Sequence, residues 1–161
     1  HRVDRRQRQM CIRDSINRSE NIKQELRKLK LIVTERSSGH KPSENCDVYI
    51  VNTYGEMSKF LRLSNVTFIG GSLVNHGGQN PLEAVRMGNY VMHGKKVNNF
   101  KEIYKELNSL KISSEIKNID QMEKLFVKNH NYKISNSKLN KINYLGAKIF
   151  ENNVKEIKNY L

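Results

Sequence analysis

The chain has 161 residues, of which 37% are hydrophobic, and a formal net charge of +13. This length and apolar content are sufficient to bury the core of one globular domain. No apolar run approaches the roughly 20 residues needed to span a bilayer. The two cysteines exclude a disulfide-rich framework and lack metal-ligand spacing such as CxxC, so a reducing, cytoplasmic setting is the default expectation.

Residues 1–15 are left out of the prediction of the fold. The first 14 residues contain five arginines and show no apolar period. They resemble translated adaptor sequence at the edge of an assembled read, so we expect a non-native leader. The alternative is a basic arm that binds nucleic acid. Residues 16–161 are then expected to form a single domain.

Predicted helices and strands alternate along the rest of the chain. In the first helix, Ile22, Leu26 and Leu29 share one face. Such alternation implies an α/β fold, with a Rossmann-like, doubly wound and mostly parallel sheet. The predicted elements are, in chain order, a helix at 20–29, strands at 31–34 and 48–51, a helix at 57–63, a strand at 66–69, a helix at 81–87, a strand at 90–92, a helix at 99–107, a strand at 112–116, and helices at 120–127 and 136–160.

The most informative feature is a glycine-rich segment between a predicted strand and a helix. Glycine pairs occur at 70–71, directly after the strand at 66–69, and at 77–78. Asn80 is a good N-cap, and Pro81 suits the first helical position. Glycines permit positive φ and leave no Cβ between the backbone and a ligand. The segment therefore predicts N–H groups at a helix start that bind a phosphate-bearing ligand.

Glu83 falls at the third position of this predicted helix and has two interpretations. It can close a capping box by bonding back to the backbone of Asn80. Alternatively, its carboxylate can accept hydrogen bonds from the vicinal hydroxyls of a ribose. The spacing alone leaves both open, because the glycine loop fits neither the dinucleotide pattern nor the ATP-binding P-loop.

Four motifs in register resemble the donor-site signature of the Kdo transferases, which attach 3-deoxy-D-manno-octulosonic acid (Kdo) from CMP-Kdo to lipid A precursors. The first is Gly70-Gly71-Ser72 with residues 76–83, His-Gly-Gly-Gln-Asn-Pro-Leu-Glu. Upstream, residues 52–56 resemble Asp-Thr-x-Gly-Glu. Downstream, residues 93–95 resemble Phe-Gly-Pro, and residues 99–103 resemble Asn-Phe-x-Glu-Ile. The resemblance runs from about Ile16 to the C-terminus.

The resemblance implies a GT-B glycosyltransferase, in which two Rossmann-like domains face a cleft and the C-terminal one holds most of the donor. This chain would be that C-terminal half. The general base of the family is a glutamate of the N-terminal domain, so no catalytic residue is expected here and the chain alone would be inactive. The resemblance assigns donor (CMP) contacts to Tyr54, Gly55, Glu56, Ser72, Gly77, Gly78, Asn80, Pro81, Leu82 and Glu83, with Arg18 and Asn99 as further candidates.

Within this set, the resemblance implies that Glu83 holds the ribose hydroxyls, that backbone N–H groups of residues 77–80 hold the phosphate, and that residues 54–56 border the cytidine. The sequence departs from the family at several motif positions. Asp14 and Ser15 replace an Arg-His pair, Asn52 replaces Asp, and Lys95 replaces Pro. Without the basic pair, we expect weak nucleotide binding.

The expected role is donor binding in lipopolysaccharide biosynthesis, at the cytoplasmic face of the bacterial inner membrane for the full-length protein. The partners implied are CMP-Kdo and, through the missing domain, the lipid A precursor. We expect no metal, no cofactor and no nucleic acid. The positive charge fits either a solvated lysine-rich surface or attraction to an anionic membrane. Two alternatives stay open: another GT-B enzyme that uses a UDP-sugar, and a non-enzymatic basic binding module. His76 and His93 are interpreted as structural rather than as ligand contacts.

Overall fold

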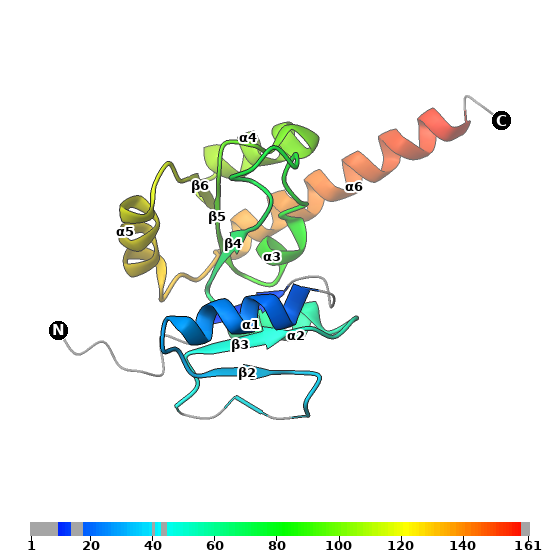
Figure 1. Cartoon of the computed structure of the whole chain (residues 1–161). Coiled ribbons are helices and arrows are strands. Elements are labelled where there is room, and N and C mark those ends of the chain that lie inside the picture. Colours follow the sequence, from blue (N-terminus) through cyan, green and yellow to red (C-terminus); the bar gives the residue numbers. More distant parts are fainter. Residues whose placement is uncertain (1–9, 14–17, 40, 43–44, 159–161) are drawn as a thin grey trace. The chain divides into compact units, whose positions relative to one another are not determined.

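The structure, a computed structural model, describes residues 10–13, 18–39, 41–42 and 45–158 (Figure 1). The chain divides into two compact units, within residues 1–60 and 61–161. Each unit has its own sheet of three parallel strands. The predicted α/β class with parallel, Rossmann-like strands is confirmed. The single sheet that we expected is instead two sheets, and the domain boundaries stay a prediction.

The first unit is built around a central strand that is buried along its whole length. The strand order is β1-β3-β2, and both edges of β3 are paired. All four side chains of β3 are buried, as expected of a parallel strand. The elements are β1 (Met10–Arg13), α1 (Ser19–Lys28), β2 (Val33–Glu35), β3 (Val48–Val51) and the start of α2 (Met57–Leu63).

Residues 10–13 form a strand that the sequence did not reveal. They pair in parallel with β3, with Met10 opposite Val48 and Arg13 opposite Val51. These four residues lie in the segment that we left out of the prediction of the fold. A strand this short carries no readable period, so only its pairing with β3 identifies it. The non-native origin of residues 1–15 stays a prediction, and residues 1–9 and 14–15 lie outside the described part.

One small apolar cluster holds this unit together. Cys46, Tyr49 and Val51 are buried and pack with Phe60 of α2. The rings of Tyr49 and Phe60 lie 5.8 Å apart between centroids, a favourable separation for an aromatic pair. The turn after α1 passes through Lys30 at φ 59°. This turn delays the start of the strand. β2 begins at Val33, two residues after the start of the predicted strand at 31–34.

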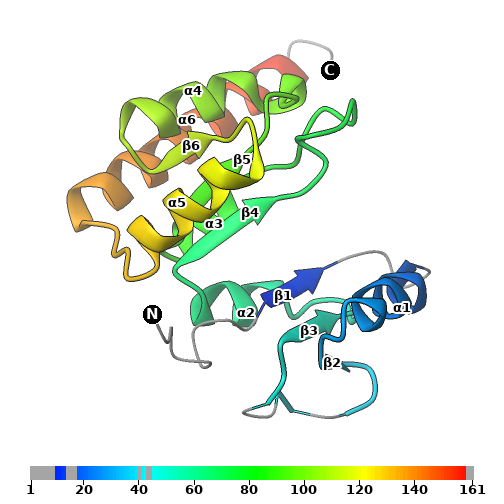
Figure 2. The ribbon, with the colours of Figure 1, turned by 60° about the vertical axis from the view of Figure 1, so that its left-hand side comes forward.

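The second unit is a three-layer arrangement around the sheet β4-β5-β6. Figure 2 shows α5 over one face of this sheet, with α3 and α6 over the other. This two-sided cover is the reason that the strand β5 is buried throughout. The elements are β4 (Val66–Ile69), α3 (Leu82–Arg86), β5 (Tyr90–His93), η3 (Asn98–Phe100, a 3-10 helix), α4 (Lys101–Ser109), β6 (Ser113–Glu115), α5 (Ile119–Asn129) and α6 (Asn136–Lys158).

Apolar side chains and one amide form the core of the second unit. Tyr90, Met92 and Ile116 are buried on the sheet face that α5 covers, where partly buried side chains such as Leu125 pack on them. Asn89 is fully buried, donates to the carbonyl oxygen of Leu61 at 2.7 Å and accepts from the hydroxyls of Ser64 and Thr67. A polar side chain is tolerated in a protein core when its polar atoms are hydrogen-bonded, as the amide oxygen and nitrogen of Asn89 are.

The register of the sheet aligns the ends of its three strands. Ile69 lies opposite His93, and His93 lies opposite Glu115. The loops that follow these residues therefore leave the sheet at one rim, the carboxyl ends of parallel strands. Ligands of open α/β sheets bind at this rim. The predicted glycine loop, at residues 70–80, is one of these loops.

Among the described helices, none is both long enough and apolar enough to cross a membrane.

Candidate functional site

Ser72 fastens the loop after β4 to the loop after β5. Its side chain is fully buried; the hydroxyl donates to the carbonyl oxygen of Ile69 at 2.5 Å and accepts from the N–H of Gly94 at 2.8 Å. The N–H of Lys96 donates to the Ser72 carbonyl oxygen at 2.7 Å. Because its hydroxyl is engaged inside the protein, Ser72 does not present that group to a ligand. The predicted donor contact of Ser72 stays a prediction, and any such contact would have to come from another atom than its hydroxyl.

Gly94 is required by the same contact. A Cβ at this position would lie 2.4 Å from the carbonyl oxygen of Ser72 and 2.7 Å from its carbonyl carbon. These neighbours are backbone atoms, which cannot swing away as a flexible side chain can. The close approach of two loops thus explains the glycine in the motif at residues 93–95.

The second glycine pair also lies against the loop after β5. Gly77 and Gly78 have φ of +80° and +75°. A Cβ on Gly77 would lie 2.5 Å from the side-chain nitrogen of Asn99, and one on Gly78 would lie 3.1 Å from the Cα of Val97. The N–H of Asn99 donates to the carbonyl oxygen of Gly77 at 3.2 Å. The structure therefore brings together three predicted site residues, Gly77, Gly78 and Asn99.

The start of α3 is organised by Asn80. Its side-chain oxygen accepts a hydrogen bond from the N–H of Leu82 at 3.0 Å, as a capping residue does. Pro81 and Leu82 are buried, so they anchor the turn and leave their backbone at the rim. The helix covers Leu82–Arg86, which is one residue shorter at each end than the predicted range of 81–87.

Glu83 is exposed in the first turn of α3. Within the residues that the structure describes, its carboxylate has no hydrogen-bond or ion-pair partner, so the capping-box interpretation is not what the structure adopts. An acidic group without an internal partner, next to a turn of positive-φ glycines, is open to a ligand. The structure thus leaves the ribose interpretation of Glu83 as a prediction.

The first unit places another predicted carboxylate in the opposite situation. Glu56 accepts from Arg36 twice, Nε to Oε2 and Nη2 to Oε1, both at 2.9 Å. Thr53 donates to its Oε2 at 2.7 Å, and Lys59 donates to its Oε1 at 3.2 Å. These hydrogen bonds, above all those from Arg36, hold the pKa of Glu56 far below its usual range. Glu56 is thus bound inside its own unit.

The loops after β2 and β3 are joined by a second pair of side chains. Ser37 donates its N–H to Asn52 Oδ1 at 3.0 Å, and Asn52 Nδ2 donates to the Ser37 hydroxyl at 2.8 Å. Beside them, Gly55 has φ +76° and Tyr54 is 79% exposed. The ring of Tyr54 is therefore available for stacking. Arg18, the further candidate in this unit, is exposed just before α1.

Arg36 is a site-organising residue that we did not predict. It follows β2 directly, and the carboxyl ends of the parallel strands β2 and β3 lie at one rim. A lone arginine after a predicted strand was the available signal. Asp14 and Ser15, which stand where the family has an Arg-His pair, lie outside the described residues.

The two histidines near the rim differ in exposure. His93 is buried, its Nδ1 lies 2.8 Å from the carbonyl oxygen of Gly94, and its ring centroid is 4.3 Å from that of Tyr104. His93 is therefore structural, as interpreted. His76 is exposed, with its side chain beside Gly71.

The Tyr104 hydroxyl donates to the carbonyl oxygen of Gln79 at 2.9 Å, which fixes the glycine loop from the α4 side.

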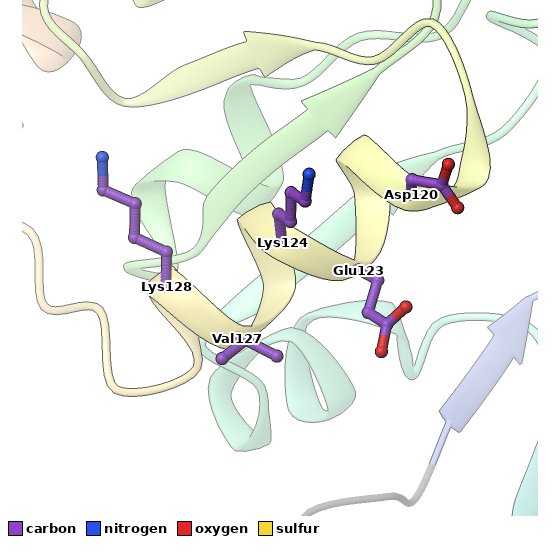
Figure 3. Close-up of a pocket in the computed structure, with 5 residues that line it drawn as sticks. All are labelled: Asp120, Glu123, Lys124, Val127 and Lys128. Atoms are coloured by element: carbon purple, nitrogen blue, oxygen red, sulfur yellow. The ribbon is translucent and has the colours of Figure 1, made fainter.

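A shallow hollow on α5 does not belong to this site. It is lined by one helix alone, and Figure 3 shows two acidic and two lysine side chains around it. It contains none of the predicted residues, and its charges cancel. Its lining residues are Asp120, Glu123, Lys124, Val127 and Lys128.

Among the described residues, no group of three or more His, Cys, Asp or Glu side chains could hold a metal ion. The expectation that the site needs no metal or cofactor stays a prediction.

Comparison with known proteins gives consistent matches. No protein-family model matches the chain. The chain is 40% identical over 82 residues to the 3-deoxy-D-manno-octulosonic acid transferase of Haemophilus influenzae, a match to 51% of this chain and 19% of that protein. It is 31% identical over 130 residues to the protein of the same name from Rickettsia bellii, a match to 81% of this chain and 26% of that protein. The chain thus spans about a quarter or less of these relatives.

A solved structure matches the fold as well. The C-terminal CMP-Kdo binding domain of WaaA from Acinetobacter baumannii is similar with a TM-score of 0.67 and 26% sequence identity. The match covers 70% of this chain and 59% of that one. Sequence and structure therefore point to the same group of proteins.

Proposed function

We propose that this chain, a relative of the Kdo transferases that matches their C-terminal domain, binds the nucleotide-sugar donor CMP-Kdo. The resemblance seen in the sequence is confirmed by these matches, which favour neither a UDP-sugar enzyme nor a non-enzymatic basic module. The observation that carries the proposal is the carboxylate of Glu83, which is exposed, has no partner among the described residues and lies next to the positive-φ glycines at the rim of the second unit.

The ribose and the phosphate of the nucleotide each have a candidate partner in the second unit. Glu83 would accept hydrogen bonds from the two ribose hydroxyls, which an ionised carboxylate can do through both oxygens. Backbone N–H groups of residues 77–80 would donate to the phosphate. Their turn is supported by the Asn99 contact and by the cap that Asn80 makes to Leu82.

We further propose that the chain acts as part of a glycosyltransferase of lipopolysaccharide biosynthesis. In such an enzyme it would present CMP-Kdo to a lipid A precursor held by another domain, at the cytoplasmic face of the inner membrane. Departure of CMP requires stabilisation of the phosphate charge, which oriented N–H groups can provide. Deprotonation of the acceptor hydroxyl requires a general base, which we expect from that other domain. The donor site is proposed to work without a metal.

The experiment is a nucleotide competition followed by NMR. The ¹⁵N-labelled chain is titrated with CMP, UDP and AMP, and the amide shifts are mapped onto the sequence. We expect CMP to bind most tightly and to shift the amides of residues 77–83. Preference for UDP would move the assignment to a UDP-sugar enzyme. CMP shifts confined to other residues would overturn the proposed site.

A further inference from the structure

We propose that three lysines at the strand ends of the second unit bind the carboxylate of the donor's acidic sugar. This inference rests on the proposed function and names the part of the site that holds the sugar. The lysines surround a hollow of about 480 Å³, a size within the range of small-molecule sites. The hollow is lined by Leu73, Lys95, Lys96, Glu115, Ile116 and Lys117.

The hollow is built from the three loops that leave the sheet at one rim. Leu73 comes from the loop after β4, Lys95 and Lys96 follow β5, and Lys117 follows β6. Parallel α/β sheets bind their ligands at this edge. Ile116 is buried in the core of the unit with Tyr90 and Met92, so it anchors the backbone between Glu115 and Lys117.

Backbone contacts tie this hollow to the proposed phosphate site. The N–H of Lys96 donates to the Ser72 carbonyl oxygen at 2.7 Å, and the carbonyl oxygen of Lys96 lies 3.2 Å from the point where a Gly78 Cβ would be. The same short segment therefore borders the lysines on one side and the glycine turn on the other. A ligand with a phosphate at the turn could extend its sugar along this segment.

The charge of the hollow selects an anion. Three lysines face one carboxylate, that of Glu115, which leaves two positive charges in excess. Within the described part of the chain, none of these four side chains forms an ion pair with another residue. The hollow on α5 offers a direct contrast, because its two lysines are matched by Asp120 and Glu123 (Figure 3).

The ligand class follows from the chemistry of the donor. Kdo is an acid, so the sugar carries a carboxylate besides the phosphate that joins it to the nucleoside. The glycine turn offers N–H groups for the phosphate, which leaves the sugar carboxylate without a partner in that turn. Lys95, at the position where the family pattern has proline, provides a cation that such a carboxylate can bind.

The test uses the whole chain and two matched double variants. Lys95→Gln with Lys96→Gln removes two charges from the rim, and Lys124→Gln with Lys128→Gln removes two from the α5 hollow. Each protein is titrated by NMR with free Kdo, with its neutral methyl ester, and with CMP. We expect Kdo to shift the amides of residues 73, 95–97 and 117 in the unchanged chain and in the α5 variant. The rim variant should bind Kdo about 10- to 100-fold more weakly, since it loses one or two charge-assisted contacts and each changes affinity by about a factor of ten.

The outcomes separate this inference from the proposed nucleotide site. Equal binding of Kdo and its methyl ester, or equal loss in both variants, would overturn the carboxylate contact. A rim variant that loses CMP binding as strongly as Kdo binding would assign the lysines to the phosphate and also overturn it. A Glu83→Gln variant that loses CMP but keeps the Kdo shifts supports the inference. Kdo shifts without any CMP binding by the unchanged chain would contradict the proposed nucleotide site alone.

Discussion

The two units hold their strand-end loops by different means. In the first unit, side chains do this: Arg36 binds both oxygens of Glu56, and Ser37 pairs with Asn52. In the second unit, the Ser72 hydroxyl bonds only to backbone groups, and Gly94 lies so close to the Ser72 backbone that no Cβ fits between them. As a result, one predicted carboxylate is used by the fold, and the other, Glu83, is left exposed.

The difference shows how to tell a motif residue that supports the fold from a motif residue that can contact a ligand. A carboxylate with four hydrogen bonds from its own unit has little capacity left for a ligand, and moving it would take away the ion-pair partner of Arg36. A loop fixed by glycines and backbone bonds needs no charged side chain for its shape. Glu83 and the lysines at the same rim have no ion-pair partner within the described part of the chain, so they are accessible to a ligand. Four predictions can break or sharpen this comparison.

The largest effect is expected for Gly94→Ala. The added Cβ would lie 2.4 Å from the carbonyl oxygen of Ser72, so one of the two loops must move. We expect a loss of about 3 kcal/mol in the free energy of unfolding, as for an overpacked interior. Urea unfolding followed by circular dichroism measures it. The control is Gly70→Ala, where a Cβ would meet no atom within 4 Å. Equal loss in both variants would contradict the contact-based explanation.

Glu83→Gln should mainly change binding. The neutral amide keeps the size of the side chain but weakens two hydrogen bonds to ribose hydroxyls, so CMP should bind about 10- to 100-fold more weakly. Isothermal titration or NMR titration provides the measurement, with Glu123→Gln on α5 as control. Because Glu83 has no partner among the described residues, the Glu83→Gln variant should unfold at the same urea concentration as the unchanged chain. A destabilised variant with normal CMP affinity would reverse the roles that we assign to the two carboxylates.

Asn80→Ala tests the cap of α3. The substitution removes the side-chain oxygen that accepts from the Leu82 N–H at 3.0 Å. Loss of such a cap costs about 1 kcal/mol of unfolding free energy. Asn75→Ala, in the exposed part of the same loop, is the matched control. If both alanine variants unfold at the same urea concentration, the cap does not contribute as we infer.

The smallest effect at neutral pH is expected for Glu56→Gln, because the Arg36–Glu56 pair is partly exposed and screened by solvent. Its signature is the pH dependence. The pKa of Glu56 is lowered in the folded state, so its stabilisation is present above the ordinary value of 4.5 and is lost as the pH falls below it toward the folded pKa.

This loss can be measured by urea unfolding, followed by the NMR signals of the first unit. The urea midpoint is determined for the unchanged chain and for Glu56→Gln at pH values from 7 to 3. The midpoint of the unchanged chain should fall more steeply below pH 4.5 than that of the variant. Glu83→Gln, which lacks such partners, should follow the unchanged chain. Parallel curves for all three proteins would show that the ion pair does not stabilise the folded first unit.

Much of the secondary structure was predictable from local patterns. The strands at 48–51 and 66–69 and the helix at 57–63 match their predicted bounds, because apolar or β-branched runs end there at clear breaks. The predicted strand at 31–34 lies two residues too early because the turn at Lys30 was not visible in the pattern. The strand at 10–13 was missed because it becomes a strand only through its pairing with β3.

For the candidate site, the sequence alone determined the α/β class, the glycine turn and the residues that resemble the family motif, since these depend on neighbours in the chain. Only the tertiary structure decided how each residue is used. It buried Ser72, bound Glu56 to Arg36 across 20 positions of sequence, and left Glu83 without a partner among the described residues. The physical reason is that hydrogen-bond partners and close approaches are set by which strand ends meet in space, and strand order is not written in any local pattern.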